Sequence, residues 1–151
     1  MMRAARCYGG ALVTLALCSA GCGKFTQARE CGTFVKTVNA WLSSSSATAA
    51  ASADAGASSD PKQIAVEARR TADHYAELSK SLAGLHIQAE DLAPRVKRYE
   101  EIADSAASTL REVAGALDQG DLEQARQKRV DFDTVARREA PLVKEINGLC
   151  R

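Results

Sequence analysis

Residues 91–120 read DLAPRVKRYEEIADSAASTLREVAGALDQG, and this stretch carries the clearest structural signal in the chain. Its apolar side chains recur in alternating steps of four and three residues. The members of this stripe are Leu92, Val96, Tyr99, Ala103, Ala106, Leu110, Val113 and Leu117. A repeat close to 3.5 residues predicts a long helix with a seam suited to knobs-into-holes packing.

Three further segments carry helical apolar patterns, and no segment alternates as a strand would. Two of them repeat similar steps, and the last is a broader face with polar interruptions. Their members are Ala28, Cys31, Val35, Val38 and Leu42, with Phe34 and Trp41 beside them; Ile64, Ala68, Thr71, Tyr75, Leu78, Leu82 and Leu85; and Leu122, Ala125, Phe132, Val135, Ala136, Leu142, Val143, Ile146 and Leu149. We therefore predict an all-α fold of four amphipathic helices with coiled-coil-like packing.

Start and stop signals bound the predicted helices. Asp60 precedes Pro61, which suits an N-cap followed by a first-turn proline, and Gly84 ends that helix. Asp91 is expected to cap the next helix, and Asp121 the last one. Because the connections at 85–91 and 118–121 are short, successive helices should be antiparallel neighbours in an up-down-up-down four-helix bundle.

The first connection has a different composition. Residues 43–59 are almost wholly Ser and Ala. With so few apolar groups to pack, this segment is predicted to be a flexible linker, although its alanines could also extend the first helix.

The N-terminal residues have the pattern of an export signal. Arg3 and Arg6 precede an apolar core at 11–17, which small residues follow. A transmembrane helix is the weaker interpretation, because four glycines interrupt the 17 uncharged residues from Cys7 to Gly23 and a span needs about 20 mostly apolar residues.

Ala20-Gly21-Cys22 resembles the lipobox of bacterial lipoproteins, although Ser19 stands where that motif usually has Leu. The resemblance implies removal of residues 1–21 and acylation of Cys22, and two acyl chains give stable membrane anchoring. Since Gly23 rather than Asp follows the cysteine, it also implies the outer membrane of a Gram-negative cell, with the domain facing the periplasm or the cell surface. The alternative is an ordinary secreted protein cleaved near Ala20.

On this interpretation the chain divides into a signal peptide at 1–21, a lipid-anchored tether at 22–27 and a helical domain at 28–151. Export and acylation would leave Cys31 and Cys150 as the remaining cysteines in an oxidising compartment, so we expect one disulfide between them. A zinc or redox site is not expected, because the chain has no C-x-x-C pair and no histidine near either cysteine in sequence.

Charge and motifs exclude several classes of function. Without the signal, the chain has 18 Lys plus Arg and 19 Asp plus Glu, which argues against binding nucleic acid. His74 and His86 are the only histidines, and neither has a glutamate three residues earlier, as the Glu-x-x-His motif of di-iron bundles requires. With no G-x-S-x-G motif either, we expect no enzyme, no metal site and no cofactor.

Glu139 is the one charge placed squarely on an apolar stripe. Since Pro141 follows it, the last helix should kink near 137–141. One interpretation places the carboxylate at the edge of the stripe, exposed or paired with an arginine. The other is a polar pocket at the kink, with Arg137 or Arg138 as the counter-charge.

These features together predict a non-enzymatic, lipid-anchored helical bundle. It would contact the membrane through the acyl chains on Cys22 and present a structural or protein-binding surface to a partner in the cell envelope. The alternative is a bundle-type periplasmic receptor for a small molecule or metal ion.

Overall fold

The computed structural model describes residues 19–53 and 60–151, and within them the chain is all-helical. Side chains are described for 24–44 and 60–151. The helices are α1 (Ser19–Ala53), α2 (Pro61–Ala83), α3 (Ala93–Asp118), α4 (Leu122–Ala136) and α5 (Glu139–Leu149). The signal peptide predicted at 1–21 lies largely outside the described residues.

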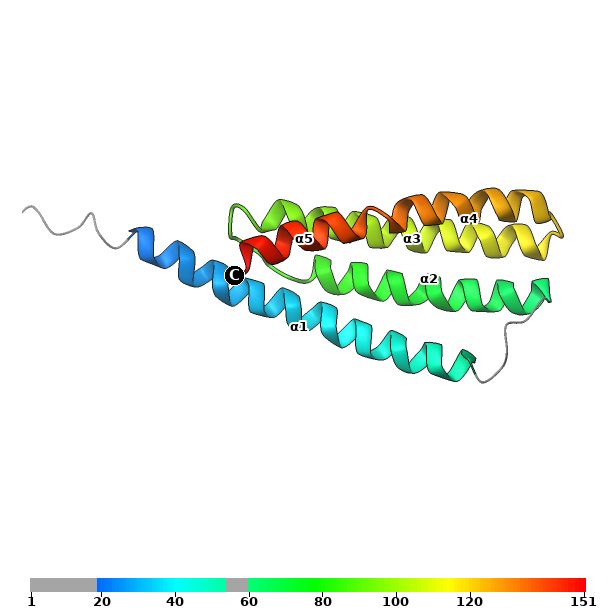
Figure 1. The fold of residues 1–151 in the computed structure, drawn as a ribbon, viewed down its shortest axis with the longest axis horizontal. Coiled ribbons are helices and arrows are strands. Elements are labelled where there is room, and N and C mark those ends of the chain that lie inside the picture. Colours follow the sequence, from blue (N-terminus) through cyan, green and yellow to red (C-terminus); the bar gives the residue numbers. More distant parts are fainter. Residues whose placement is uncertain (1–18, 54–59) are drawn as a thin grey trace, which may run out of the picture.

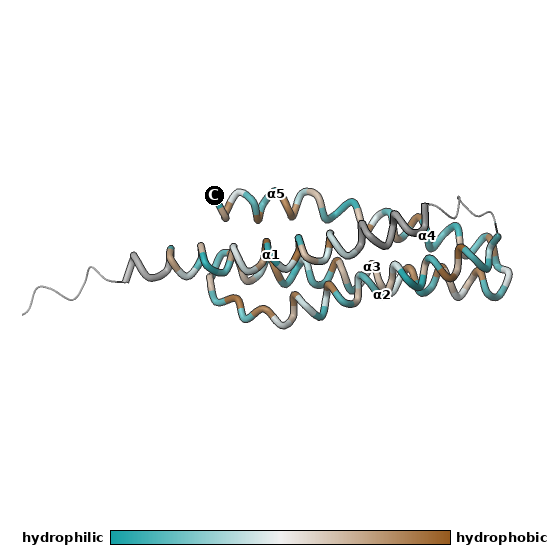
Figure 2. The backbone as a smooth tube through the Cα atoms, turned by 90° about the horizontal axis from the view of Figure 1, so that it is seen from below, coloured by the Kyte–Doolittle hydropathy of each residue, from teal (hydrophilic) through white to brown (hydrophobic). Residues whose placement is uncertain are grey.

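The helices form an elongated assembly in which α2 and α3 pack closely along each other (Figure 1). The segments α4 and α5 follow one another along α3, and α1 lies against α2. Both views show the first turns of α1 projecting beyond the other helices (Figures 1 and 2).

The capping predictions are confirmed at two helix starts. The Asp60 side chain accepts a hydrogen bond from the Lys62 amide at the start of α2, and Asp121 accepts one from Gln124 at the start of α4. Gly84 follows the last residue of α2, as predicted.

The cap predicted at Asp91 is wrong. The helix α3 begins at Ala93, after Leu92, and no side chain caps it. The amides of Leu92 and Ala93 both donate to the Ala89 carbonyl, so Asp91 lies inside a turn that leads into the helix. Pro94 does fall in the first turn of α3, where its missing amide donor is not needed.

The predicted fourth helix is interrupted at the expected place. The segment α4 ends at Ala136 and α5 begins at Glu139, so the interruption is a break at Arg137 and Arg138. Pro141 explains it, because proline has no amide to donate to the carbonyl of residue 137 and its ring clashes with that carbonyl in a continuous helix.

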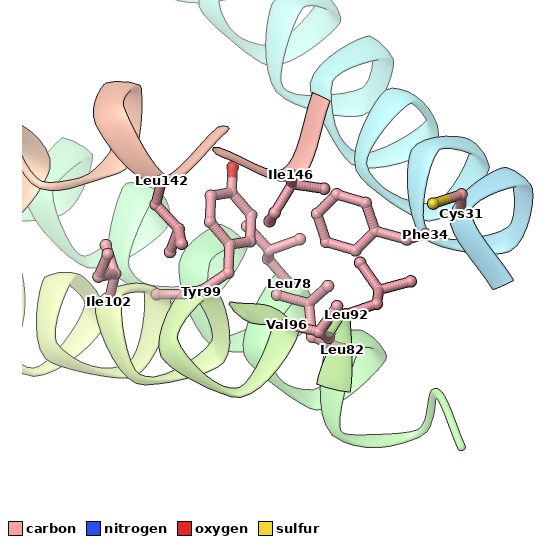
Figure 3. Close-up of a cluster of buried hydrophobic side chains, with 11 residues drawn as sticks. Cys31, Phe34, Leu78, Leu82, Leu92, Val96, Tyr99, Ile102, Leu142 and Ile146 are labelled. Atoms are coloured by element: carbon pink, nitrogen blue, oxygen red, sulfur yellow. The ribbon is translucent and has the colours of Figure 1, made fainter. Parts of the chain in front are cut away.

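The main core lies at the end of the assembly where the α2–α3 connection and the end of α5 meet α1 (Figure 3). Its buried members come from α1, α2, α3 and α5 and from Leu92 just before α3. They are Cys31, Phe34, Leu78, Leu82, Leu92, Val96, Tyr99, Ile102, Ala103, Leu142 and Ile146. A smaller cluster farther along α2 and α3 consists of Ala65, Ala68, Val113 and Ala114, with Leu117 packed against it.

The apolar stripe of α3 is inward-facing as predicted, but the stripes of α2 and α1 depart from the prediction at some positions. In α2 the predicted Ala68, Leu78 and Leu82 are buried, but Ala65 is buried in place of its exposed neighbour Ile64. In α1 the side chains that face the core are Cys31, Phe34, Val38 and Trp41, whereas the predicted Ala28, Val35 and Leu42 are exposed.

The bounds of α1 also differ from the predicted segment boundaries. It begins at Ser19, so the residues predicted as a tether, 22–27, are helical. It continues to Ala53, so residues 43–53 of the predicted linker are helical too, in line with the alternative that the alanines extend the first helix. The rest of the predicted linker, 54–59, lies outside the described residues.

Candidate functional site

The predicted disulfide between Cys31 and Cys150 is confirmed. The two sulfur atoms are 1.99 Å apart and the Cα atoms 5.6 Å apart, and the bridge spans 119 residues. Beside it the Gln27 side-chain amide donates to the Leu149 carbonyl at 3.3 Å. The bridge therefore joins the first part of α1 to the end of α5. Cys22 lies in the first turns of α1, but its side chain is not among those described.

Glu30 binds the connection between α2 and α3. Its carboxylate oxygens accept the Gln88 amide at 3.0 and 3.1 Å and the Ala89 amide at 2.8 Å. Sequence reasoning missed this contact because 58 residues separate the partners and nothing local marks Glu30. It fixes α1 to the α2–α3 connection at the disulfide end.

Glu139 is half-buried, and its hydrogen-bond partner is Tyr99 of α3. The Tyr99 hydroxyl donates to Glu139 Oε1 at 2.5 Å. Neither Arg137 nor Arg138, the predicted counter-charges, is the partner in the structure. Both arginines are exposed at the break, and Glu139 accepts a hydrogen bond from a phenol instead. Their short distance in sequence from Glu139 does not bring the charges together, since side chains one or two residues apart point in different directions around a helix.

A row of aromatic rings adjoins this pair. Trp41 and Tyr75 have ring centroids 5.4 Å apart, and Tyr75 and Phe132 have theirs 6.1 Å apart with the rings nearly perpendicular. The Trp41 indole donates to the His74 carbonyl at 2.8 Å, which fixes the indole against α2. All three rings of the row are half-buried.

Burial and the nearby Glu139 both raise the pKa values of Tyr99 and Tyr75. Burial, then the hydrogen bond to Glu139, raises the pKa of Tyr99 far above its ordinary value. Burial, then the charge of Glu139, raises the pKa of Tyr75. Both phenols are therefore neutral at physiological pH.

The two histidines lie in α2 and in the connection that follows it. His74 is partly buried, with its Nδ1 3.9 Å from the Glu77 carboxylate, and His86 is exposed in the α2–α3 connection. Among the described residues, no group of three or more His, Cys, Asp or Glu side chains is placed to hold a metal ion. Within that same part of the chain, no helix has the length and apolar character to cross a membrane.

Several large apolar side chains are exposed. Val66 at the start of α2 is 59% exposed and Leu122 at the start of α4 is 51% exposed, and both starts lie at the end opposite the disulfide (Figure 1). Phe25, in the projecting part of α1, is 76% exposed. The molecule thus exposes apolar side chains at both ends.

Comparisons of the chain with protein-family models, curated proteins and solved structures found no match.

Proposed function

We propose that this protein is anchored to a bacterial outer membrane by acyl chains on Cys22 and holds a helical bundle close to the lipid surface. The observation that carries the proposal is the Cys31–Cys150 disulfide, which lies at the end of the assembly nearest Cys22. The nine residues from Cys22 to Cys31 are helical throughout, so they span about 14 Å. A lipid on Cys22 would therefore keep the disulfide end at the membrane.

For the fold we propose an up-down-up-down bundle with coiled-coil-like packing. Cross-helix contacts support it, because partners run in opposite order along neighbouring helices. Arg69 and Asp73 of α2 pair with Asp118 and Arg111 of α3, and Lys128 and Glu145 of α4 and α5 pair with Glu112 and Arg98 of α3. The spacing of three, four and three residues among the inward side chains of α1 supports seam packing.

The end opposite the disulfide is the surface we propose for a protein partner in the envelope. It would face away from the membrane, and Ile64, Val66 and Leu122 expose apolar area there. These three exposed apolar side chains favour contact with another protein, since burying them removes apolar area from water.

A labelling experiment tests the anchor. The full chain is expressed in a Gram-negative host fed an alkyne-tagged fatty acid, and membranes are separated by density. We expect label on the wild type in the outer-membrane fraction, none on Cys22→Ala, and wild-type behaviour for the matched control Cys18→Ala. Unlabelled wild-type protein with an N-terminus near residue 21 would overturn the anchor.

A crosslinking experiment tests the partner surface. A photoreactive amino acid is placed at Val66 or Leu122, and at the exposed Glu101 of α3 as the control. We expect a discrete crosslinked species of reproducible mass in intact cells from Val66 and Leu122 but not from Glu101. Equal crosslinking at all three positions would contradict a dedicated surface at that end.

A further inference from the structure

A groove lies between α1 and α2 and continues to the connection that follows α2. Its larger hollow has a volume of about 660 Å³, and Lys36 and Trp41 of α1 and Lys80 of α2 are among its lining residues. A second hollow of about 430 Å³ continues it toward the start of α1, because the two hollows share Thr33 and Leu85 in their lining. The groove can therefore hold an extended ligand.

Three exposed basic side chains line this groove without an ion-pair partner. They are Arg29, Lys36 and Lys80, and within the described residues no ion pair joins any of them to an acid. Elsewhere in the bundle Arg111 and Lys128 do pair with acids of neighbouring helices. The three basic groups of the groove are thus available to the anionic groups of a ligand.

Two acids also line the groove, and one of them is already bound. The Glu30 carboxylate accepts the amides of Gln88 and Ala89. Glu77 is exposed, with its carboxylate 3.9 Å from His74 Nδ1. Three permanent positive charges therefore face two carboxylates, one of which is held by backbone amides, and the groove favours an anionic ligand.

The spacing of the basic groups indicates a ligand with several acidic groups. Arg29 and Lys36 are seven residues apart in α1, so two helical turns, or about 10 Å along the axis, separate their positions. Lys80 belongs to the facing helix. One carboxylate cannot contact all three side chains, whereas a chain that carries a carboxylate on each unit can.

The threonine hydroxyls of the groove indicate what else the ligand carries. Thr33 Oγ1 donates to the Arg29 carbonyl at 3.1 Å, and Thr37 Oγ1 donates to the Thr33 carbonyl at 3.0 Å. A hydroxyl has one proton and two lone pairs, so each oxygen can still accept a hydrogen bond but has no second proton to donate. The hydroxyl groups of a sugar are suitable donors.

The Trp41 indole adds an apolar surface to the same groove. Its N–H donates to the His74 carbonyl at 2.8 Å, so it has no further hydrogen bond to give a ligand. What it offers is the carbon surface of the ring, which suits the C–H face of a sugar.

We propose that the groove between α1 and α2 binds an acidic oligosaccharide, whose carboxylates contact Arg29, Lys36 and Lys80. The threonine hydroxyls accept hydrogen bonds from the sugar hydroxyls, and Trp41 packs against a sugar ring. The site depends neither on the lipid anchor nor on the partner surface at the other end, so each proposal can fail without the others.

The test uses Trp41, the only tryptophan in the chain, as the reporter, with calorimetry in parallel. The full chain in non-ionic detergent is titrated with tetragalacturonate, with the uncharged sugar maltotetraose and with the acidic peptide tetraglutamate. We expect saturable binding of tetragalacturonate that weakens as salt is added, and binding weaker by about tenfold or more for maltotetraose. Tetraglutamate should also bind more weakly, because it has no sugar hydroxyls.

Several outcomes would overturn the proposal. If neither fluorescence nor calorimetry detects saturable binding of tetragalacturonate, the groove is not such a site. Equal binding of maltotetraose would contradict the role of the basic side chains, and equal binding of tetraglutamate would contradict the assignment to a sugar.

Variants locate the site. Replacing Lys36 and Lys80 together with glutamine should weaken tetragalacturonate binding by about tenfold or more and leave the fold intact, because both side chains are exposed. Lys62 and Lys144 are exposed lysines outside the groove, and the same double change there should leave affinity unchanged. Helical circular dichroism checks the fold of both proteins. An equal loss in both would mean attraction to the net charge alone, and a folded Lys36 and Lys80 variant with wild-type affinity would refute the site.

Discussion

At the scale of single residues, the Tyr99–Glu139 hydrogen bond is the contact with the clearest energetic consequence. Tyr99 is 2% exposed, so its hydroxyl depends on Glu139 as an acceptor, whereas the half-buried carboxylate can also reach water. Removing the acceptor, Glu139, should therefore cost more stability than removing the donor, the Tyr99 hydroxyl. An unsatisfied buried donor costs more than a lost bond whose remaining partner is solvated.

We expect Glu139→Ala to lower the free energy of unfolding by about 1–3 kcal/mol and Tyr99→Phe to lower it by about 1 kcal/mol. Urea unfolding followed by circular dichroism measures both values. Glu145→Ala is the control, because it removes partly exposed ion pairs with Arg95 and Arg98 that are worth about 0–1 kcal/mol. If Glu139→Ala lowers the free energy of unfolding no more than Tyr99→Phe does, the Tyr99 hydroxyl does not depend on Glu139 as its acceptor.

The tyrosines also predict a dependence on alkaline pH. Burial raises the pKa of Tyr99 and of Tyr75 in the folded protein, so the folded state holds these protons more tightly than the unfolded state. Their stabilising effect is complete below about pH 10, the ordinary pKa of tyrosine, and is lost as the pH rises above it. Melting temperatures between pH 8 and pH 11 should fall at the upper end.

Tyr99→Phe isolates this effect, because it removes the phenol and leaves the lysines that also titrate in that range. The variant should lose less stability than the wild type between about pH 10 and pH 11. Parallel curves for the two proteins would mean that Tyr99 is not the titrating group.

The sequence indicated Glu139 because a charge on an apolar stripe is a local anomaly. It did not indicate Tyr99, which is 40 residues away and belongs to the best apolar stripe of the chain. Asp60 and Asp121 were predictable as caps because their partners lie two and three residues away. These two local caps could be predicted, whereas the hydrogen bond between Tyr99 and Glu139 could not.

At the scale of helices, α2 and α3 approach each other through small side chains. Ala65 and Ala72 of α2 and Ala106 and Ala114 of α3 are each 0% exposed. Alanine at such positions lets the two backbones come close. Because Ala65 occupies the buried position, its neighbour Ile64 is exposed to solvent. The apolar spacing alone favoured the larger Ile64 over its neighbour Ala65, because alanine is common on both buried and exposed helix faces.

We expect Ala72→Leu to destabilise the protein by about 1–3 kcal/mol, because the extra carbons have no space between α2 and α3. Ala83→Leu, at the exposed end of the same helix, should change the stability by no more than about 0.5 kcal/mol. Thermal unfolding of the two variants compares them directly. Equal melting temperatures would show that α2 and α3 can separate at little cost.

At the scale of the whole molecule, α1 differs from the other helices in how it is held. Its contacts with the other helices include the hydrogen bonds of Gln27 and Trp41 and the covalent bond of Cys31. The helices α2 and α3 are joined by the second apolar cluster and by the Arg69–Asp118 ion pair. An ion pair between Lys128 and Glu112 joins α4 to α3, and none of these contacts involves α1. The disulfide is therefore the strongest single link between α1 and the rest.

Replacing Cys31 and Cys150 together with serine should lower the free energy of unfolding by about 2–5 kcal/mol. Because Trp41 lies on α1, we also expect its fluorescence to shift at a lower urea concentration than the loss of helical circular dichroism. The wild type under oxidising conditions should show the two transitions together. Coincident transitions in the double variant would mean that α1 is as firmly packed as the other helices.

The all-helical class was predictable from periodicity, and the disulfide from the two cysteines that the proposed export and acylation would leave. The face of α1 that packs against the core was not predictable from the sequence. Val35 and Leu42 fit the heptad spacing as well as Phe34 and Trp41 do, and only contact with Tyr99 and Tyr75 selects the second pair. One-dimensional spacing cannot choose between two adjacent stripes of a broad apolar face.

The Cys31–Cys150 bridge joins two residues 119 positions apart in the sequence, so the backbone between them is closed into a covalent ring. A protease that cuts once inside the ring, for example at the turn that contains Gly120, opens the ring without releasing either piece. The fragment with α4 and α5 remains bonded to the one that carries Cys22, so with the proposed lipid on Cys22 a single cut would leave both fragments attached to the membrane.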